Sequence, residues 1–331
     1  MTTFKRVEMS NTVEIREEDF VEAFSMSDYV ACCSQAFQLF GDATLSNPLR
    51  EEHVDRQRGM DHFSLVMPAE WPGRYSACKR IEEFSDVSSG QLARREAYIE
   101  LRDLVRDNAV RLDAGHITDM RTGAAGALAL QYIATRPIRR IALLGTGRVA
   151  RALTLACDGL FDLQEVRCTS RRAENRDAFA RDVGSEMRAP LNMVATQGEC
   201  MRDVNALLMA VPTPEPIVGV QSVEEIDYLV VMGGDSRTRQ VESAVLERRP
   251  VLVDLWEQAE KSGEFRWARA QQQLERIDLM RGESGDALTI GDAALGRAGR
   301  PRACAYLTGL AVQDLCAAAM IYEGWKTQNA T

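Results

Sequence analysis

One short stretch limits the possible folds most strongly, residues 141–156, which read IALLGTGRVARALTLA. An apolar run predicts a buried strand, and a helical pattern follows the glycines. In a dinucleotide-binding unit, Gly145 would make the tight turn and Gly147 would let the backbone approach a pyrophosphate, while the small Ala150 would let helix and strand pack closely. The strand before the glycines and the helix after them favour this interpretation over an accidental glycine pair.

From Arg139 onward the chain alternates short apolar runs with helical segments. Near-continuous apolar runs of this length are typical of strands buried on both faces of a parallel sheet. The alternation therefore predicts an α/β fold with a Rossmann-type, doubly wound parallel sheet. The predicted strands are RIALLG, EVRCTS, MVAT, NALLMAV, YLVVMGG and PVLVDL.

The flanking segments have a different pattern. Residues up to about 41 predict a short strand and an amphipathic helix, and residues 47–119 contain alternating runs that predict a sheet with one covered face. An alanine-rich helix from His116 leads into the parallel unit. The closing segment, from Pro301 to Lys326, predicts one long helix, apolar nearly all round, that must pack on the first domain or on a partner subunit.

We therefore expect two domains. Residues 120–301 form the Rossmann dinucleotide-binding domain, which is inserted in a discontinuous α+β domain of residues 1–119 and 302–331. The discontinuous domain is expected to bind the substrate and to form a homodimer, because its sheet edge and the apolar last helix both need cover.

The end of the second Rossmann strand indicates the cofactor. An NAD site expects an acidic residue there, to bind the ribose 2′-hydroxyl. This chain has Ser170, Arg171 and Arg172, and its Glu165 stands at the start of the strand. A hydroxyl and two guanidinium groups suit a 2′-phosphate, so NADP(H) is favoured and NAD(H) is the alternative. The two arginines also fit a plain, solvated helix start.

The composition excludes several classes of protein. A net charge of -9 argues against a nucleic-acid surface. The eight cysteines form no C-x-x-C pair, and the three histidines do not pair with them at ligand spacing, so we expect free thiols in a reducing compartment and no metal site. We find no signal-peptide pattern and no apolar run of membrane-spanning length, and so expect a cytoplasmic protein without a membrane partner.

Several ordered motifs resemble the ornithine cyclodeaminase/mu-crystallin family along nearly the whole chain. Members of that family include amino-acid cyclodeaminases, alanine dehydrogenases, ketimine reductases and NADPH-binding crystallins, so the resemblance implies a fold more closely than a substrate. The motifs are HITDMRTGAAGALALQYIA, IALLGTGRVARAL, VRCTSRRAENRDAFA, VVMGGDSRTRQVES, VLVDLWEQAEKSGEF and TGLAVQDLCAAA.

The resemblance implies roles for individual residues. Arg50, Lys79 and Arg121 match basic residues around the substrate carboxylate, and three such cations also suggest a carboxylate site on chemical grounds. Asp235 matches the acid/base beside the nicotinamide, with Lys79 as the second catalytic candidate. The implied cofactor contacts are Thr122, Gly145, Gly147, Arg148, Val149, Ser170, Arg171, Arg172, Ala210, Val211, Met232 and Thr308.

Each assignment has a structural alternative. Lys79 alternates with apolar neighbours and fits an outward, solvated lysine. Arg121 fits a cap or an ion pair of its helix. Asp235 fits a helix N-cap.

One departure from the family bears on the reaction. Ornithine cyclodeaminases have a glutamate two residues before the dipeptide MP, where it holds the distal amino group of the substrate, and this chain has Leu65 there. A leucine cannot pair with an ammonium group. We therefore expect an NAD(P)H-dependent oxidoreductase that acts on the C–N bond of a small, carboxylate-bearing imino or amino acid. The alternatives are a cyclodeaminase that uses bound NAD and a non-catalytic, crystallin-like NADPH-binding protein.

Overall fold

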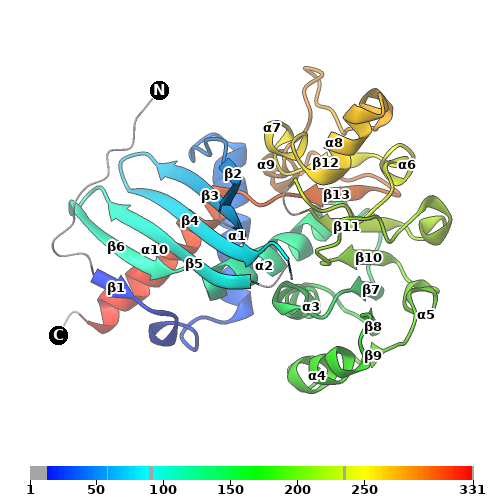
Figure 1. The fold of residues 1–331 in the computed structure, drawn as a ribbon, viewed down its shortest axis with the longest axis horizontal. Coiled ribbons are helices and arrows are strands. Elements are labelled where there is room, and N and C mark those ends of the chain that lie inside the picture. Colours follow the sequence, from blue (N-terminus) through cyan, green and yellow to red (C-terminus); the bar gives the residue numbers. More distant parts are fainter. Residues whose placement is uncertain (1–12, 58, 89–91, 234–235, 330–331) are drawn as a thin grey trace.

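The computed structural model describes residues 13–57, 59–88, 92–233 and 236–329. Two sheets lie side by side, and helix α2 (Gly115–Ile133) lies between them (Figure 1). The predicted catalytic residue Asp235 falls outside the described residues.

The first sheet has six strands in the order β1-β6-β5-β4-β3-β2. Burial alternates along β3 and β4, as expected for a sheet with one covered face. Helix α10 (Ala311–Gln328) packs on that face against β3, β4 and β5, α1 (Met26–Gly41) and α2 pack on α10, and Figure 1 shows no helix on the other face. The strands are β1 (Val13–Ile15), β2 (Glu51–Gln57), β3 (Met60–Trp71), β4 (Tyr75–Asp86), β5 (Leu92–Asp103) and β6 (Asn108–Asp113).

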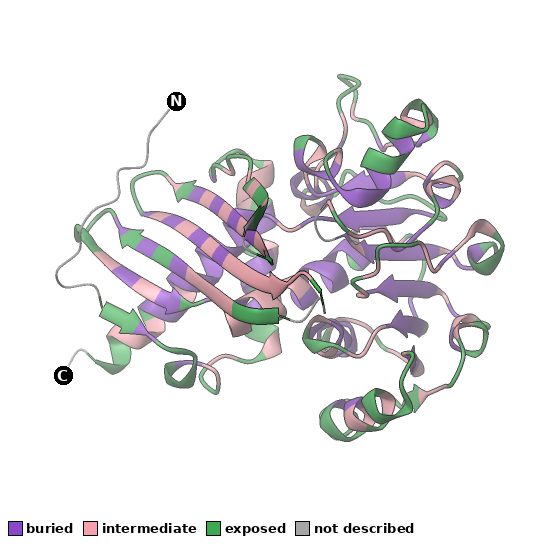
Figure 2. Cartoon of the chain, in the orientation of Figure 1, coloured by how far each residue is buried: buried purple, intermediate pink, exposed green. Residues whose placement is uncertain are grey.

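The second sheet is parallel throughout, in the order β12-β13-β11-β10-β7-β8-β9. Its central strands are fully buried, as Figure 2 shows, which explains their continuous apolar sequences. The predicted fold class is confirmed. The strands are β7 (Arg140–Leu144), β8 (Glu165–Thr169), β9 (Leu191–Met193), β10 (Ala206–Met209), β11 (Tyr228–Met232), β12 (Val251–Val253) and β13 (Cys304–Leu307).

Helices and turns connect these parallel strands and cover them. The helices are α3 (Arg148–Leu160), α4 (Ala173–Gly184), α5 (Gln197–Met201), α6 (Ser243–Leu246), α7 (Trp256–Ala259), α8 (Gly263–Ala270) and α9 (Ile290–Ala294). Three 3₁₀ turns span Glu17–Asp19, Val220–Val223 and Leu274–Arg276.

The closing segment differs from its prediction as a single helix. Its first part is strand β13, which inserts between β11 and β12, and only the part from Ala311 is helical. A short apolar run has the same composition in a buried strand and in a buried helix, so the sequence pattern did not separate them. The predicted end of the Rossmann domain at residue 301 therefore leaves β13 outside the sheet to which it belongs. We place the end of that domain after Leu307. The predicted boundary at 119/120 falls inside α2.

Close helix packing joins the two sheets. A Cβ atom on Gly123 of α2 would lie 2.4 Å from the carbonyl carbon of Ala152 in α3, so α2 and α3 pack closely there because residue 123 is glycine. Helix α10 is apolar and buried because it packs on β3, β4 and β5 of its own chain. No helix within the described ranges combines the length and apolar character needed to cross a bilayer.

Candidate active site between the two sheets

A cavity of ≈ 380 Å³ lies where the six-stranded sheet faces the carboxyl ends of the parallel strands. Its walls come from the discontinuous domain, from α2 and from the loops that follow β10, β11 and β13. Crevices at the carboxyl ends of parallel strands are the usual ligand sites of α/β sheets. The lining includes nine predicted site residues, Arg50, Lys79, Arg121, Thr122, Val149, Ala210, Val211, Met232 and Thr308.

The strand register arranges the floor of the cavity in rows. Met67 pairs with Lys79, and one row further Leu65 pairs with Glu52 on one side and with Ile81 on the other. Paired residues point to the same face of a sheet, so these side chains project together into the cavity. One row of the floor therefore contains the cation Lys79. The next row contains the apolar Leu65 and Ile81, with the carboxylate of Glu52 at its edge.

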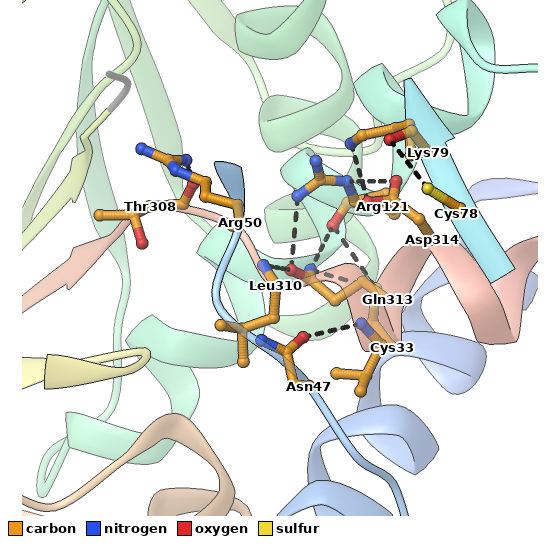
Figure 3. A network of polar contacts seen from close by, with 12 residues as sticks. Cys33, Asn47, Arg50, Cys78, Lys79, Arg121, Thr308, Leu310, Gln313 and Asp314 are labelled. Carbon is orange, nitrogen blue, oxygen red and sulfur yellow. Dashed lines mark hydrogen bonds and ion pairs between the residues drawn. The ribbon is translucent and has the colours of Figure 1, made fainter. Parts of the chain in front are cut away.

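Three charged side chains meet at the cationic end, as Figure 3 shows. Lys79 Nζ of β4 lies 2.7 Å from Asp314 Oδ2 of α10, and Arg121 Nε of α2 lies 3.2 Å from Asp314 Oδ1. The Lys79 side chain is only 1% exposed. The solvated-lysine alternative is therefore wrong. Arg121 does form an ion pair, but its partner Asp314 lies in α10 and not in its own helix, and it belongs to the same cluster as Lys79.

Residues around the cluster fix the position of Arg121. Gln313 accepts a hydrogen bond from Arg121 Nη1 at 3.3 Å and donates one to the Arg121 carbonyl at 3.3 Å. The amide of Leu310 donates to the same Gln313 side-chain oxygen. Gly309 has φ +86, and a Cβ atom there would lie 2.7 Å from Arg121 Nη1, so glycine is required beside the guanidinium.

Burial changes the protonation of Lys79. Loss of hydration, together with the neighbouring Arg121 charge, lowers the pKa of Lys79 to about 7, although Asp314 opposes the shift. A lysine with this pKa exchanges its proton near neutral pH. It is therefore suited to general acid/base chemistry.

Arg50 reaches the cavity from the segment before β2. Its Nη1 donates to the Thr308 carbonyl at 2.9 Å, and its Nη2 lies 3.7 Å from Glu52. Buried Asp254 holds the Thr308 segment by accepting from the backbone amides of Thr308 and Gly309, both at 2.6 Å. Arg50 is thus held against this loop, next to Thr308 (Figure 3).

The glycine turn has the geometry of a pyrophosphate cradle. Gly145 has φ +116, and a Cβ atom there would lie 2.6 Å from the Ala210 carbonyl oxygen. A Cβ atom on Gly147 would meet no protein atom within 4 Å, and no side chain caps the helix α3 that begins at the next residue. Open space in front of uncapped helix N–H groups is what a phosphate group requires, so these residues fit a dinucleotide.

The other predicted cofactor residues lie along the same edge of the parallel sheet. Arg148 opens α3, is exposed and lies 3.1 Å from Asp119. Ser170, Arg171 and Arg172 follow β8 outside the cavity. Neither Arg171 nor Arg172 has an acidic partner among the described residues. Their assignment to a 2′-phosphate remains a prediction.

The anionic half of the site was not predicted from the sequence. Asp314 and Gln313 form a polar pair inside an otherwise apolar helix, and a buried charge in such a helix is itself a signal of a site. Glu83 was also missed. It accepts from Arg95 Nε at 3.1 Å and lies 3.9 Å from Arg237 at the far end of the floor.

Comparison with known proteins decides the family. A model described as the ornithine cyclodeaminase/mu-crystallin family matches residues 7–329. The chain belongs to this family. The resemblance stated from the motifs is thereby confirmed.

Individual relatives are distant. Ketimine reductase mu-crystallin of Rattus norvegicus is 24% identical over 83% of each chain. Alanine dehydrogenase of Archaeoglobus fulgidus is 27% identical over 66% of each chain, so the match spans slightly less than two thirds of that relative.

Solved structures support the fold. Δ(1)-pyrroline-2-carboxylate reductase of Thermococcus litoralis, solved with NADH and L-proline, superposes with a TM-score of 0.82 over 97% of this chain and 99% of that one. The two sequences are 19% identical. The superposition therefore supports a shared architecture.

Proposed function

We propose that the protein is an NADPH-dependent oxidoreductase that reduces the C=N bond of a small α-imino acid, or oxidises the corresponding amino acid. The observation that carries the proposal is the buried Lys79–Asp314–Arg121 cluster, which faces the carboxyl edge of a Rossmann sheet across the cavity. Its relatives named as a ketimine reductase and an alanine dehydrogenase support the same reaction class.

The cofactor is proposed to lie along the parallel sheet. The amides at the start of α3 would hold its pyrophosphate, and Thr122, Ala210 and Val211 would line the nicotinamide end. Arg171 and Arg172 would bind a 2′-phosphate, because no acidic side chain stands at the end of β8 to accept a ribose hydroxyl. When bound, the nicotinamide supplies the hydride for the imine carbon.

The protein's own residues bind the substrate and move the proton. Arg121 and Arg50 would hold the substrate carboxylate, with Lys79 beside them, which fixes the α-carbon against the nicotinamide. Protonated Lys79 would donate its proton to the imine nitrogen, so that hydride and proton together give the amine. Asp314 would keep Lys79 and Arg121 in place. Asp235 is proposed, from the family resemblance, as the second acid/base.

A cyclodeaminase is the second candidate. Leu65 lies in the cavity floor, where it offers no counter-charge to a distal amino group. Glu52 stands opposite on the neighbouring strand, but it already accepts from Ser236 at 2.7 Å and lies near Arg50. A carboxylate with two partners is a weaker site for a further ammonium group, which favours the reductase.

We also propose that the protein forms a homodimer and lies in the cytoplasm. The uncovered face of the six-stranded sheet favours a homodimer through that face. Eight free cysteines, seven of them buried, suit a reducing cytoplasm. The ligand is a small carboxylate, and nothing in the charge balance favours a nucleic acid.

A spectrophotometric screen tests the proposal. The purified protein is offered cyclic imines, 2-oxo acids with amines, and amino acids, with NADPH and NADH in parallel. We expect stoichiometric NADPH consumption with at least one imine. Product without net NADPH change would indicate a cyclodeaminase, and NADPH binding without turnover a crystallin-like protein. A preference for NADH would contradict the role of Arg171 and Arg172.

A further inference from the structure

A second hollow of ≈ 430 Å³ adjoins the cavity and shares Arg50 and Glu52 with it. None of the described residues that line this hollow has an apolar side chain, in contrast to the lining of the cavity. Such a lining suits a charged or hydrated group rather than a hydrocarbon chain. The lining residues are Arg50, Glu52, Ser236, Gln258, Glu260, Lys261, Arg266 and Arg269.

The hollow has an excess of positive charge in a chain whose net charge is -9. Of the described residues that line it, four are cationic and two are acidic. Arg269 pairs with Glu260, and Arg50 lies 3.7 Å from Glu52. Lys261 and Arg266 have no acidic partner among the described residues. Two cations left without counter-charge beside a reaction cavity favour an anionic ligand.

The hollow and the carboxylate-binding end of the cavity share a wall. Gln258 Nε2 donates to Thr308 Oγ1 at 2.6 Å and to the Gly309 carbonyl at 2.7 Å. The Thr308 carbonyl accepts from Arg50 on the other side of the same loop. Arg50 and Gln258 thus connect the hollow with the loop of Thr308 and Gly309, which lines the cavity next to Arg121.

We infer that the hollow is a second anion subsite, which binds the distal carboxylate of a dicarboxylic α-imino, α-oxo or α-amino acid. The inference rests on the proposed function for the place of the α-carboxylate, at Arg121 and Lys79. Arg50 lies between the two carboxylates and interacts with either. Lys261 and Arg266 supply positive charge for the distal carboxylate, which a monocarboxylic ligand lacks.

Calorimetric binding of succinate and of its monoamide, succinamate, tests the subsite without any turnover. The two ligands differ in one distal carboxylate. We expect the wild-type protein, saturated with NADPH, to bind succinate about tenfold or more tightly than succinamate, since a charge-assisted contact is worth about 1.4 kcal/mol or more. The double variant Lys261→Gln/Arg266→Gln should lose that preference and bind succinamate as before.

The control is Arg248→Gln/Arg276→Gln, which removes two exposed cations that line neither hollow. It should retain the preference for succinate. Equal affinities of the wild-type protein for the two ligands would overturn the subsite. An equal loss of the succinate preference in the control variant would also overturn it, because the preference would then depend only on the net charge of the protein.

Turnover of 2-oxoglutarate and 2-oxopentanoate with ammonia separates the two proposals. A succinate preference without any NADPH oxidation would refute the reductase and leave the subsite standing. Oxidation at equal kcat/KM for both oxo acids would support the reductase and overturn the subsite.

Discussion

Lys79 is the residue on which the chemistry depends. It is buried between a cation and a carboxylate, and its pKa of about 7 follows chiefly from lost hydration. Burying the two cations Lys79 and Arg121 together would be unfavourable without a counter-charge. Asp314 supplies that charge from α10, which is why an aspartate is found inside an apolar helix.

The pH dependence of kcat/KM tests this arrangement. In the reductive direction Lys79 must carry its proton, so kcat/KM should fall as the pH rises above about 7. Asp314 raises the pKa of Lys79, so Asp314→Asn should move this limb to lower pH, besides lowering kcat/KM about tenfold or more. An unshifted limb in the variant would contradict the coupling between the two residues.

At the scale of elements, the turn between β7 and α3 and the end of β8 are proposed to determine which cofactor binds. The strand–turn–helix order was predictable from sequence because its spacing is local. The insertion of β13 and the place of Asp314 were not, because both depend on which distant elements pack together. The rows of the cavity floor depend likewise on the register of β2, β3 and β4.

The two glycines of the turn should respond differently to substitution by alanine. Gly145→Ala strains the backbone and clashes with Ala210, so it should lower the free energy of unfolding by about 1–3 kcal/mol. Gly147→Ala meets no protein atom, so it should keep the stability within about 0.5 kcal/mol and weaken NADPH binding about tenfold.

The control for both is Gly159→Ala, at an open position of the same helix. It should bind NADPH like the wild type. Unchanged NADPH affinity in Gly147→Ala, measured by fluorescence titration, would remove the pyrophosphate from this turn.

Cofactor selectivity is a prediction about the end of β8. Arg171→Ala/Arg172→Ala removes two charges that NADPH would use and NADH would not. The Kd for NADPH should rise about tenfold or more, while the Kd for NADH should change little. An equal change for both cofactors would mean that the arginines are only a solvated helix start.

At the scale of the whole molecule, the two sheets enclose the site. The six-stranded sheet supplies its floor on one face, and its other face is uncovered by any helix in Figure 1. That outer face carries charged and aromatic side chains, including Arg111 over the Tyr98 ring at 3.7 Å. Such a face is suited to a polar subunit interface.

Sedimentation should therefore give a mass of twice 36.8 kDa. Tyr98→Asp, on the outer face, should shift the species towards the monomer, and Glu247→Gln, at the end of α6, should leave it a dimer. A monomeric wild-type protein at micromolar concentration would contradict the proposed interface.

The central claim is that hydride passes from NADPH to the α-carbon of a carboxylate-bearing imine. It is tested most directly by incubating the protein with NADPH deuterated at nicotinamide C4 and with a cyclic imino acid, and locating the deuterium by mass spectrometry and NMR. We predict one deuterium at the α-carbon of the product for each NADPH consumed. A product without deuterium, or formed with no net loss of NADPH, would contradict the account.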